Sequence, residues 1–403
     1  MKKGNAIVGQ SGGPTSVINS SLAGVMSAAK KSVQIETLYG MHFGIEGFMK
    51  EDLWNLSAQS DSVIDGLRKT PSSALGSSRH KLQDSDFPRI LEVLKKYDIR
   101  YFFLIGGNDT MDTIHRVEDY CSKEGYELYG VGIPKTVDND LYGTDHTPGF
   151  ASAARYNALS VQQAGALARD MKKVDQFVIY QTIGRDAGWL AAATVLAKKH
   201  EDDGPHLIYC PERAFDADKF LKDAKSCIDK YGWVSVVVSE GLKYADGSPV
   251  SATQDADNFG NTEFGAMGGA SVGLSVHRIL SKGLGLRGEF QITESLIMSA
   301  IDRAIPDDLQ KAFDCGEKAV ELAVAGISAV MVTIERVEQD GEISFKYGTT
   351  PLSSVAVRAK AMPEDYINEE GNFVTDKFLD YIKPLIPELP TYTRLEEKWG
   401  GDK

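Results

Sequence analysis

The sequence is poor in features that mark several large classes of protein. It has four cysteines among 403 residues, with no metal-type spacing: Cys121, Cys210, Cys227 and Cys315. This count and scatter argue against a disulfide scaffold or a cysteine-bound zinc ion, and favour reduced thiols. No apolar run approaches the roughly 18 residues of a membrane span. The stretch from Met1 to Val8 lacks the apolar region and cleavage site of a signal peptide. We therefore expect a cytoplasmic protein with no membrane partner.

Positive charge is scarce as well. Lys and Arg together number 44 against 57 Asp and Glu, which gives a formal net charge of −13. A chain this acidic lacks the broad basic face that nucleic acid requires, so a nucleic-acid partner is not expected. It would also repel anionic substrates. Phosphate chemistry would therefore depend on a few placed Lys and Arg side chains, on helix N-termini and on Mg²⁺.

Strand-like and helix-like segments alternate along most of the chain. The strand-like apolar runs cover residues 6–9, 34–39, 101–105, 128–133, 176–183, 207–210, 233–239 and 329–334. Strands that alternate with helices predict βαβ units, and hence mainly parallel sheets with helices on both faces. A chain of 403 residues is too long for one simple core, so the predicted fold class is α/β with two domains.

Three polar turns follow apolar runs and are candidates for a phosphate site. The first, at residues 10–19, is glycine-rich and opens a helix, but it is neither a Walker A motif nor a dinucleotide fingerprint. It fits an anion site and a plain strand-to-helix turn equally well. The second is Gly106-Gly107-Asn108-Asp109-Thr110, and the third is Pro134-Lys135-Thr136-Val137-Asp138-Asn139-Asp140.

The second and third turns predict a single cleft. In an open parallel sheet, such turns lie side by side at the carboxyl ends of the strands, where ligands bind. Together they offer backbone N–H groups, a lysine and several carboxylates, which suits a phosphate and a metal ion. The alternative for the second turn is a helix cap formed by Asp109 or Thr110. The alternative for the third turn is an acidic surface turn.

These turns resemble those of the phosphofructokinase superfamily. Further stretches match in the same order at residues 70–79, 184–189 and 238–241, and the resemblance runs from Ile7 to about Ile334. It implies a donor domain of residues 1–148 plus about 292–345, and a sugar-phosphate domain of residues 149–291. Residues 346–403 would form an extension that packs on the surface or at a subunit contact. Family members are usually homodimers or homotetramers.

Two positions separate the phosphoryl donors within the family. ATP-using members carry glycine where this sequence has Asp109 and Lys135, whereas pyrophosphate-using members carry Asp and Lys. An Asp side chain places bulk and negative charge where ATP would put its α-phosphate and nucleoside, and the lysine attracts the compact pyrophosphate. The resemblance is thus to the pyrophosphate-dependent type, which phosphorylates the 1-hydroxyl of fructose 6-phosphate with Mg²⁺ in glycolysis and gluconeogenesis.

The resemblance also implies roles for individual residues. Asp138 would be the general base for the sugar hydroxyl, supported by Asp140, with Lys135 and Asp109 completing the catalytic set. Pyrophosphate would be held by Gly13, Asp109, Thr110 and Lys135, and Mg²⁺ by Asn108 and Asp109. The acceptor would contact Thr136, Val137, Asp138, Ile183, Gly184, Arg185, Glu240 and Arg79. For Arg79, Arg185 and Glu240, a surface or interdomain ion pair is the alternative.

The sequence departs from the family where the sugar phosphate should bind. If Gln291 matches the glutamine of the family's His- or Tyr-x-Gln-Arg motif, Ile292 replaces the arginine, and Gln176 stands where a second arginine is usual. Arg287 and Arg303 are candidate substitutes. The acceptor could therefore be another sugar phosphate, such as sedoheptulose 7-phosphate, and a non-catalytic regulatory subunit is a third hypothesis. The intact stretch from Lys135 to Asp138 argues against that third hypothesis.

Overall fold

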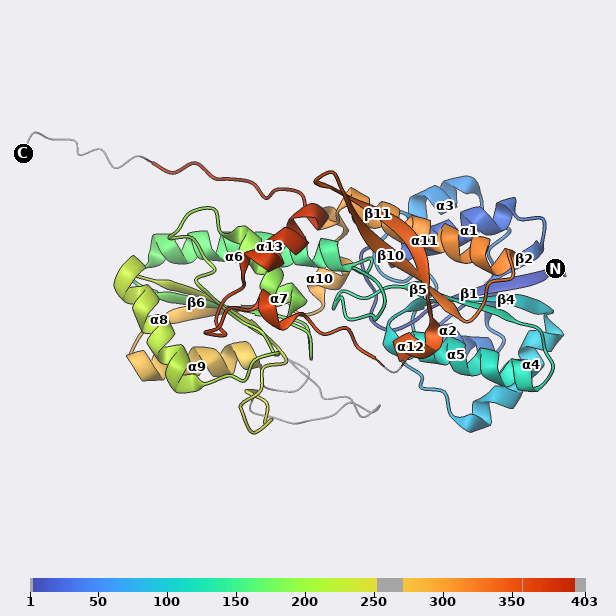
Figure 1. Cartoon of the computed structure of the whole chain (residues 1–403), viewed down its shortest axis with the longest axis horizontal. Helices are drawn as coiled ribbons and strands as arrows, with labels where there is room; N and C mark the ends of the chain where they lie inside the picture. The colour runs from blue at the N-terminus through green and yellow to red at the C-terminus, as the bar shows by residue number, and fades with distance from the viewer. Residues whose placement is uncertain (1–2, 252–270, 357, 396–403) are drawn as a thin grey trace, which may run out of the picture.

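The structure, a computed structural model, describes residues 3–251, 271–356 and 358–395. They form two lobes that follow one another along the long axis, each built on its own sheet (Figure 1). Residues 252–270 of the expected second domain, and 357 and 396–403 of the expected extension, lie outside the described residues. None of the helices in the described ranges combines the length and apolar character that a membrane crossing requires.

The first sheet has seven strands in the order β11-β10-β5-β4-β1-β2-β3. The five strands from β10 to β2 in this order run parallel to one another. The edge strand β3 runs antiparallel to β2, and the edge strand β11 runs antiparallel to β10. Their bounds are β1 (Gly4–Gln10), β2 (Ile35–Met41), β3 (Leu53–Asn55), β4 (Ile99–Gly106), β5 (Tyr129–Pro134), β10 (Val330–Gln339) and β11 (Glu342–Pro351). The central strands are apolar on both faces because helices cover both sides of the sheet.

Helices pack on each face of this sheet. One face is covered by α1 (Ile18–Lys31) and α11 (Pro306–Val324), with α3 (Asp61–Leu67) against α1. The other face is covered by α2 (Gly44–Met49), α4 (Phe87–Lys96), α5 (Asn108–Lys123) and α12 (Leu352–Ala356). Each face has its own buried apolar cluster, so this lobe is a three-layer α/β/α unit.

The second sheet has four parallel strands in the order β7-β8-β6-β9. They are β6 (Phe177–Thr182), β7 (Leu207–Tyr209), β8 (Val234–Ser239) and β9 (Gly288–Ile292). One face is covered by α8 (Ala217–Tyr231) and α9 (Val272–Leu284), and the other by α6 (Phe150–Met171) and α7 (Trp189–Ala193), while α10 (Leu296–Ser299) follows β9. The predicted fold class, α/β with mainly parallel sheets flanked by helices, is confirmed. The division into domains stays a prediction.

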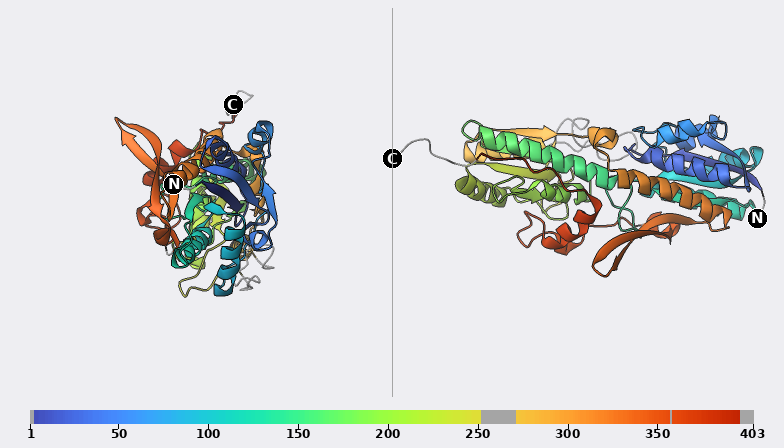
Figure 2. Two further views of the ribbon diagram at one scale, coloured as in Figure 1. Left: turned by 90° about the vertical axis from the view of Figure 1, so that its right-hand side faces the viewer. Right: turned by 90° about the horizontal axis from the view of Figure 1, so that it is seen from above.

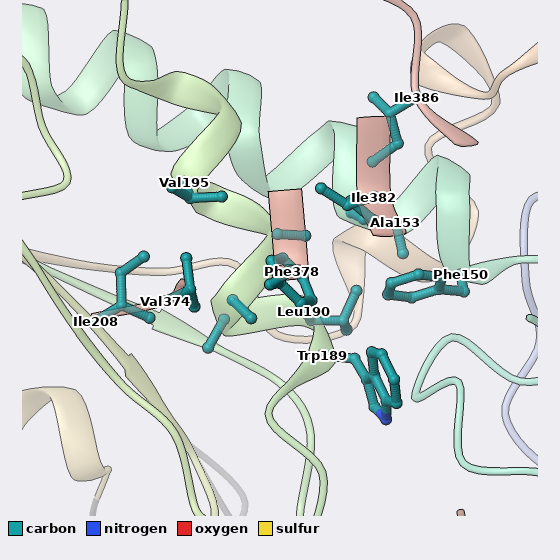
Figure 3. Packing of buried hydrophobic residues seen from close by; sticks show 14 of the residues in the cluster. Phe150, Ala153, Trp189, Leu190, Val195, Ile208, Val374, Phe378, Ile382 and Ile386 are labelled. Carbon is teal, nitrogen blue, oxygen red and sulfur yellow. The ribbon is translucent and has the colours of Figure 1, made fainter. Parts of the chain in front are cut away.

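The end of the chain contributes to both lobes. β11 carries the first sheet to Pro351, past the expected boundary at 345, because it pairs along its whole length with β10. The chain then crosses to the second lobe, where α13 (Asp376–Ile382) packs around Trp189 on α7 (Figure 3). Phe378 and Ile382 are fully buried there. This part of the expected extension therefore completes a core rather than covering a surface.

Two helices connect the lobes, and their N-termini meet. α6 leads into the second lobe and α11 leads back into the first, nearly end to end (Figure 2). Asp308, buried in the first turn of α11, accepts hydrogen bonds from the backbone N–H of Gly149 at 3.1 Å and of Ser152 at 3.0 Å, and from the Ser152 hydroxyl at 2.6 Å. The residue at the N-cap of α6, Gly149, has no side chain to cap it. The carboxylate therefore caps α6 from another helix and offsets the positive ends of both helix dipoles.

Replacing Asp308 with alanine should destabilise the protein by about 2–4 kcal/mol, because buried N–H groups at the start of α6 lose their acceptor. The matched control is Asp216→Ala. Asp216 caps α8 in the same way, through the N–H groups of Asp218 and Lys219, but is exposed. Water can replace that cap, so the control should cost only about 1 kcal/mol. Urea unfolding of the two variants measures the difference, and equal losses would contradict the interlobe role of Asp308.

Candidate active site

A cleft with a volume of about 750 Å³ lies where the lobes meet. The turns after β1, β4 and β5 line it from the first lobe, the turn after β6 lines it from the second, and residues 359–361 line it from the C-terminal segment. The structure brings many of the predicted site residues to this cleft: Gly13, Arg79, Asn108, Asp109, Thr110, Lys135, Thr136, Asp138, Asp140 and Arg185. They come from both lobes because the carboxyl ends of both sheets point to it.

The turn after β4 leads straight into α5. Only glycine fits at position 106, because a Cβ there would lie 2.1 Å from Oγ1 of Thr110. α5 begins at Asn108 after Gly107, and no side chain caps it. The helix-cap alternative for Asp109 or Thr110 is therefore wrong. The first N–H groups of α5 have no partner within the helix and lie at the cleft, which is an arrangement that favours anions.

Lys135 joins the turn after β5 to the turn after β1. Its ammonium donates a hydrogen bond to the carbonyl oxygen of Gly13 at 2.7 Å, and its side chain is almost fully buried. Burial lowers the pKa of Lys135 to about 8, while the carboxylates of Asp138 and Asp140 oppose that shift. No other described residue accepts a hydrogen bond from this ammonium. Two of its N–H groups can therefore meet an anion in the cleft.

Asp138 and Asp140 flank Asn139, which adopts a left-handed conformation with φ of 56°. Burial, followed by the negative charges of Asp140 and Glu240, raises the pKa of Asp138 to about 7, against the opposing effects of Arg185 and Lys135. Burial also raises the pKa of Asp140, which accepts a hydrogen bond from the Asn108 amide at 3.0 Å. The negative charge of Asp140 disfavours ionisation of Asp138 in this buried site, so the two carboxylates resist ionising together.

The side chain of Asn108 offers a ligand atom for a metal ion. Its Oδ1 is buried and has no hydrogen-bond partner, while its Nδ2 is engaged by Asp140. Within the described ranges, no three His, Cys, Asp or Glu side chains gather closely enough to form a complete metal site. Both observations fit Mg²⁺, which is usually held by one or two protein oxygens and completed by water and phosphate oxygens.

The second lobe supplies Arg185 and Glu240. The backbone N–H of Gly184 donates to Oε1 of Glu240 at 3.1 Å, and the hydroxyl of Ser239 donates to the Gly184 carbonyl at 2.5 Å. Burial raises the pKa of Glu240 to about 6, against the opposing effects of this hydrogen bond and of Arg185. Arg185 is exposed and lines the cleft. Gly184 and Glu240 thus support the Arg185 turn from behind.

Four of the predicted acceptor-contact residues do not line the cleft: Gly184 and Glu240, which lie behind the Arg185 turn, and the apolar residues Val137 and Ile183. Val137 is buried in the apolar cluster beneath α6 and α7, and Ile183 packs against the same cluster. Val137 lies between Thr136 and Asp138 in the chain, and Ile183 precedes Gly184. The apolar side chains point into the core, whereas Thr136 and Asp138 line the cleft. Val137 and Ile183 can help to shape the turns but do not face the cleft.

The positions that depart from the family lie away from the cleft. Gln176 and Arg287 pair through their backbones at the amino end of β6, opposite to Gly184, and Arg287 forms an ion pair with Asp175 at 2.9 Å. Arg303 donates to Ser160 at 3.0 Å and stacks on Tyr156. Neither these residues nor the β9 pair Gln291 and Ile292 line the cleft. Among the described residues, the cations that line the cleft are Arg79, Lys81, Arg116, Lys135, Arg185 and Lys360.

Three of those cations were missed in the sequence: Lys81, Arg116 and Lys360. Arg116 could have been found, because the cleft-lining residues 109, 112, 113 and 116 of α5 follow the i, i+3, i+4, i+7 spacing of one helical face. Nothing in the local sequence marks Lys360, which reaches the cleft only through the tertiary fold.

Comparisons with known proteins agree with this geometry. Residues 5–323 match the family described as Phosphofructokinase. The pyrophosphate–fructose 6-phosphate 1-phosphotransferase of Rhodospirillum rubrum is 39% identical over 404 residues, which cover 98% of each chain. The sulfofructose kinase of Alkalicoccus urumqiensis is 31% identical over 386 residues, covering 94% of this chain and 96% of that protein.

A solved structure supports the fold independently. The pyrophosphate-dependent phosphofructokinase of Nitrosospira multiformis superimposes with a TM-score of 0.86 at 39% identity, covering 98% of this chain and 94% of that one. The family match and these near full-length similarities lead to one conclusion: this chain belongs to the phosphofructokinase family.

Proposed function

We propose that this protein is a pyrophosphate-dependent phosphotransferase that phosphorylates the 1-hydroxyl of fructose 6-phosphate. The observation that carries the proposal is the pairing of Asp109 and Lys135 on one cleft: Lys135 is buried with two N–H groups to spare, and Asp109 projects from the first turn of α5. The names of the near full-length relatives support the same donor and acceptor. A homodimer or homotetramer stays a prediction.

The donor would be held by positive groups that are fixed before it arrives. The ammonium of Lys135 and the first N–H groups of α5 would bind the pyrophosphate oxygens. By the family resemblance, the carboxylate of Asp109 would lie where a nucleotide extends further, and would exclude ATP by bulk and charge. Mg²⁺, held by Oδ1 of Asn108 and by Asp109, would neutralise charge on the phosphate oxygens.

Asp138 would act on the acceptor. Its pKa of about 7 suits a group that takes a proton near neutral pH. As the sugar O1 attacks the nearer phosphorus, its proton passes to the Asp138 carboxylate, an O–P bond forms, and the P–O bond to the bridging oxygen breaks. Orthophosphate leaves with the electron pair of that bond. Arg185 would bind the acceptor from the second lobe, and Asp140 would keep Asn108 in place.

A different anionic acceptor is the second candidate. The cleft receives no arginine from β9, and one relative of nearly full length is named a sulfofructose kinase. A six-carbon ketose with a sulfonate, or sedoheptulose 7-phosphate, would place its reacting hydroxyl in the same position and differ only at the far anionic end. The complete set of cleft residues argues against a non-catalytic regulatory subunit, which would not need them.

Assays with Mg²⁺ and either pyrophosphate or ATP, against fructose 6-phosphate, sedoheptulose 7-phosphate and sulfofructose, test donor and acceptor together. We expect turnover with pyrophosphate, highest with fructose 6-phosphate, because Asp109 excludes the nucleotide. Turnover with ATP but not pyrophosphate would refute the donor assignment. Preference for another acceptor would select the second candidate, and no turnover with any pair would favour the regulatory subunit.

Asp138→Asn should lower kcat by about 10²- to 10⁴-fold, because an amide cannot accept the hydroxyl proton. Steady-state kinetics at saturating pyrophosphate and Mg²⁺ provide the measurement. Asp119→Asn is the control, since Asp119 lies further along α5 in an exposed ion pair with Lys123. A variant at position 138 with a rate close to wild type would rule out Asp138 as the base.

Glu240→Gln should move the acid limb of kcat/KM to lower pH. The base works when deprotonated, and the negative charge of Glu240 helps to raise the pKa of Asp138, so removing that charge should lower this pKa. The control is Glu212→Gln: Glu212 also accepts a backbone N–H, from Gly188, but is not among the groups that shift Asp138. Titration of the substrates is common to all variants, so an unmoved limb in Glu240→Gln would contradict the coupling.

A further inference from the structure

The C-terminal segment at residues 358–361 lies against the loop that carries Asp138 and Asp140. The backbone N–H of Lys360 donates to the carbonyl oxygen of Asp140 at 2.7 Å, and Ala359 pairs with Leu141 in an antiparallel bridge. The family match covers residues 5–323, so this contact comes from a part of the chain that follows the matched residues. The wall of the cleft on this side is therefore built by the end of the chain.

All three N–H donors of the Lys360 ammonium have hydrogen-bond acceptors in this loop. The ammonium donates to Oδ1 of Asn139 at 3.2 Å and to the carbonyl oxygens of Thr144 at 3.3 Å and Asp145 at 2.7 Å. A lysine ammonium has three N–H donors, and each has an acceptor here. Although Lys360 lines the cleft, it has no donor left for a ligand, unlike Lys135. Its contacts point to a role in holding the loop.

The contacts of Lys360 converge on the strained residue of the loop. Asn139 has φ of 56°, a conformation that costs energy unless its surroundings enforce it. Its amide is fully buried and held on three sides: Oδ1 accepts from Lys360 and from the Thr147 N–H at 3.1 Å, and Nδ2 donates to the Tyr381 hydroxyl at 2.8 Å. That hydroxyl in turn donates to the Asp145 carbonyl at 2.9 Å.

We propose that Lys360 and Tyr381 are positioning residues, which hold Asn139 in the left-handed conformation that presents Asp138 and Asp140 to the cleft. The inference rests on the proposed phosphoryl transfer for its kinetic consequence. Lys360 and Tyr381 also contact the second lobe. Lys360 Nζ lies 4.9 Å from the centre of the Trp189 ring, and Tyr381 packs against the same ring. The two residues thus fix the loop relative to the Gly184-Arg185 turn as well.

Lys360→Met tests the proposal, because it keeps an unbranched apolar side chain of nearly the same length and removes the ammonium. We expect kcat to fall by about 10²-fold with little change in either KM, since misplacing a reacting group by about 1 Å costs this much. Hydrogen–deuterium exchange of the peptide covering residues 136–147 should become faster at the same time. Lys377→Met is the matched control: Lys377 lies on α13, in an exposed ion pair with Asp365. It should change neither readout.

Tyr381→Phe provides a second variant that keeps the ring in the core and removes only the hydroxyl. It should lower kcat by about tenfold and speed exchange of the same peptide, and it decides the matter if Lys360→Met fails to fold. A rate within about twofold of wild type in a folded Lys360→Met protein would overturn the proposal. So would a large loss of kcat with unchanged exchange, which would indicate direct contact with substrate. If the wild-type protein transfers no phosphoryl group, the proposed function fails, and the exchange data alone decide on positioning.

Discussion

One buried carboxylate governs how the two lobes meet. The helices α6 and α11, which connect the lobes, direct their positive ends at each other. Asp308 lies in the first turn of α11 and accepts its hydrogen bonds from Gly149 and Ser152 at the start of α6. Burial raises its pKa, and the N–H donors that surround it oppose that shift. The site depends on this junction, because Arg185 and Glu240 affect Asp138 only while the lobes keep their relative placement. An interlobe contact of this kind limits how far the cleft can open.

The cleft reconciles an acidic protein with an anionic substrate by burying a few cations among carboxylates. Lys135 and Lys360 both have pKa values lowered to about 8 by burial, while burial raises those of Asp138, Asp140 and Glu240. Opposite charges stabilise each other there, so a change in one group affects its neighbours. The two lysines differ in role. Lys135 has N–H donors available for a ligand, whereas all three N–H donors of Lys360 bind acceptors within the protein.

Much of the fold could be read from the sequence, and the failures have physical reasons. β1, β4 and β5 are continuous apolar runs that end in glycine or proline turns, as expected for strands buried on both faces. The edge strand β9 was missed because Glu289 and Gln291 interrupt it and need no burial. The segment after Pro351 looked irregular because of its prolines, yet α13 forms once Trp189 offers it a surface. Lys360 could not be identified from the sequence either, because its role depends on Asn139, Thr144 and Asp145, which lie more than 200 positions away.

The separation in sequence between Lys360 and the loop that it holds has a consequence for folding during synthesis. Asn139 and Lys360 are 221 positions apart. At a synthesis rate of about 5–20 residues per second, roughly 10–40 s would pass between the synthesis of Asn139 and that of Lys360. The first lobe's central strands and the loop that carries Asn139 emerge early, but the contacts that hold this loop can form only after Lys360 has been synthesised. The nascent chain would thus carry the cleft-lining turns of both sheets while still lacking Lys360, and the loop would reach its final conformation only after that residue has joined it.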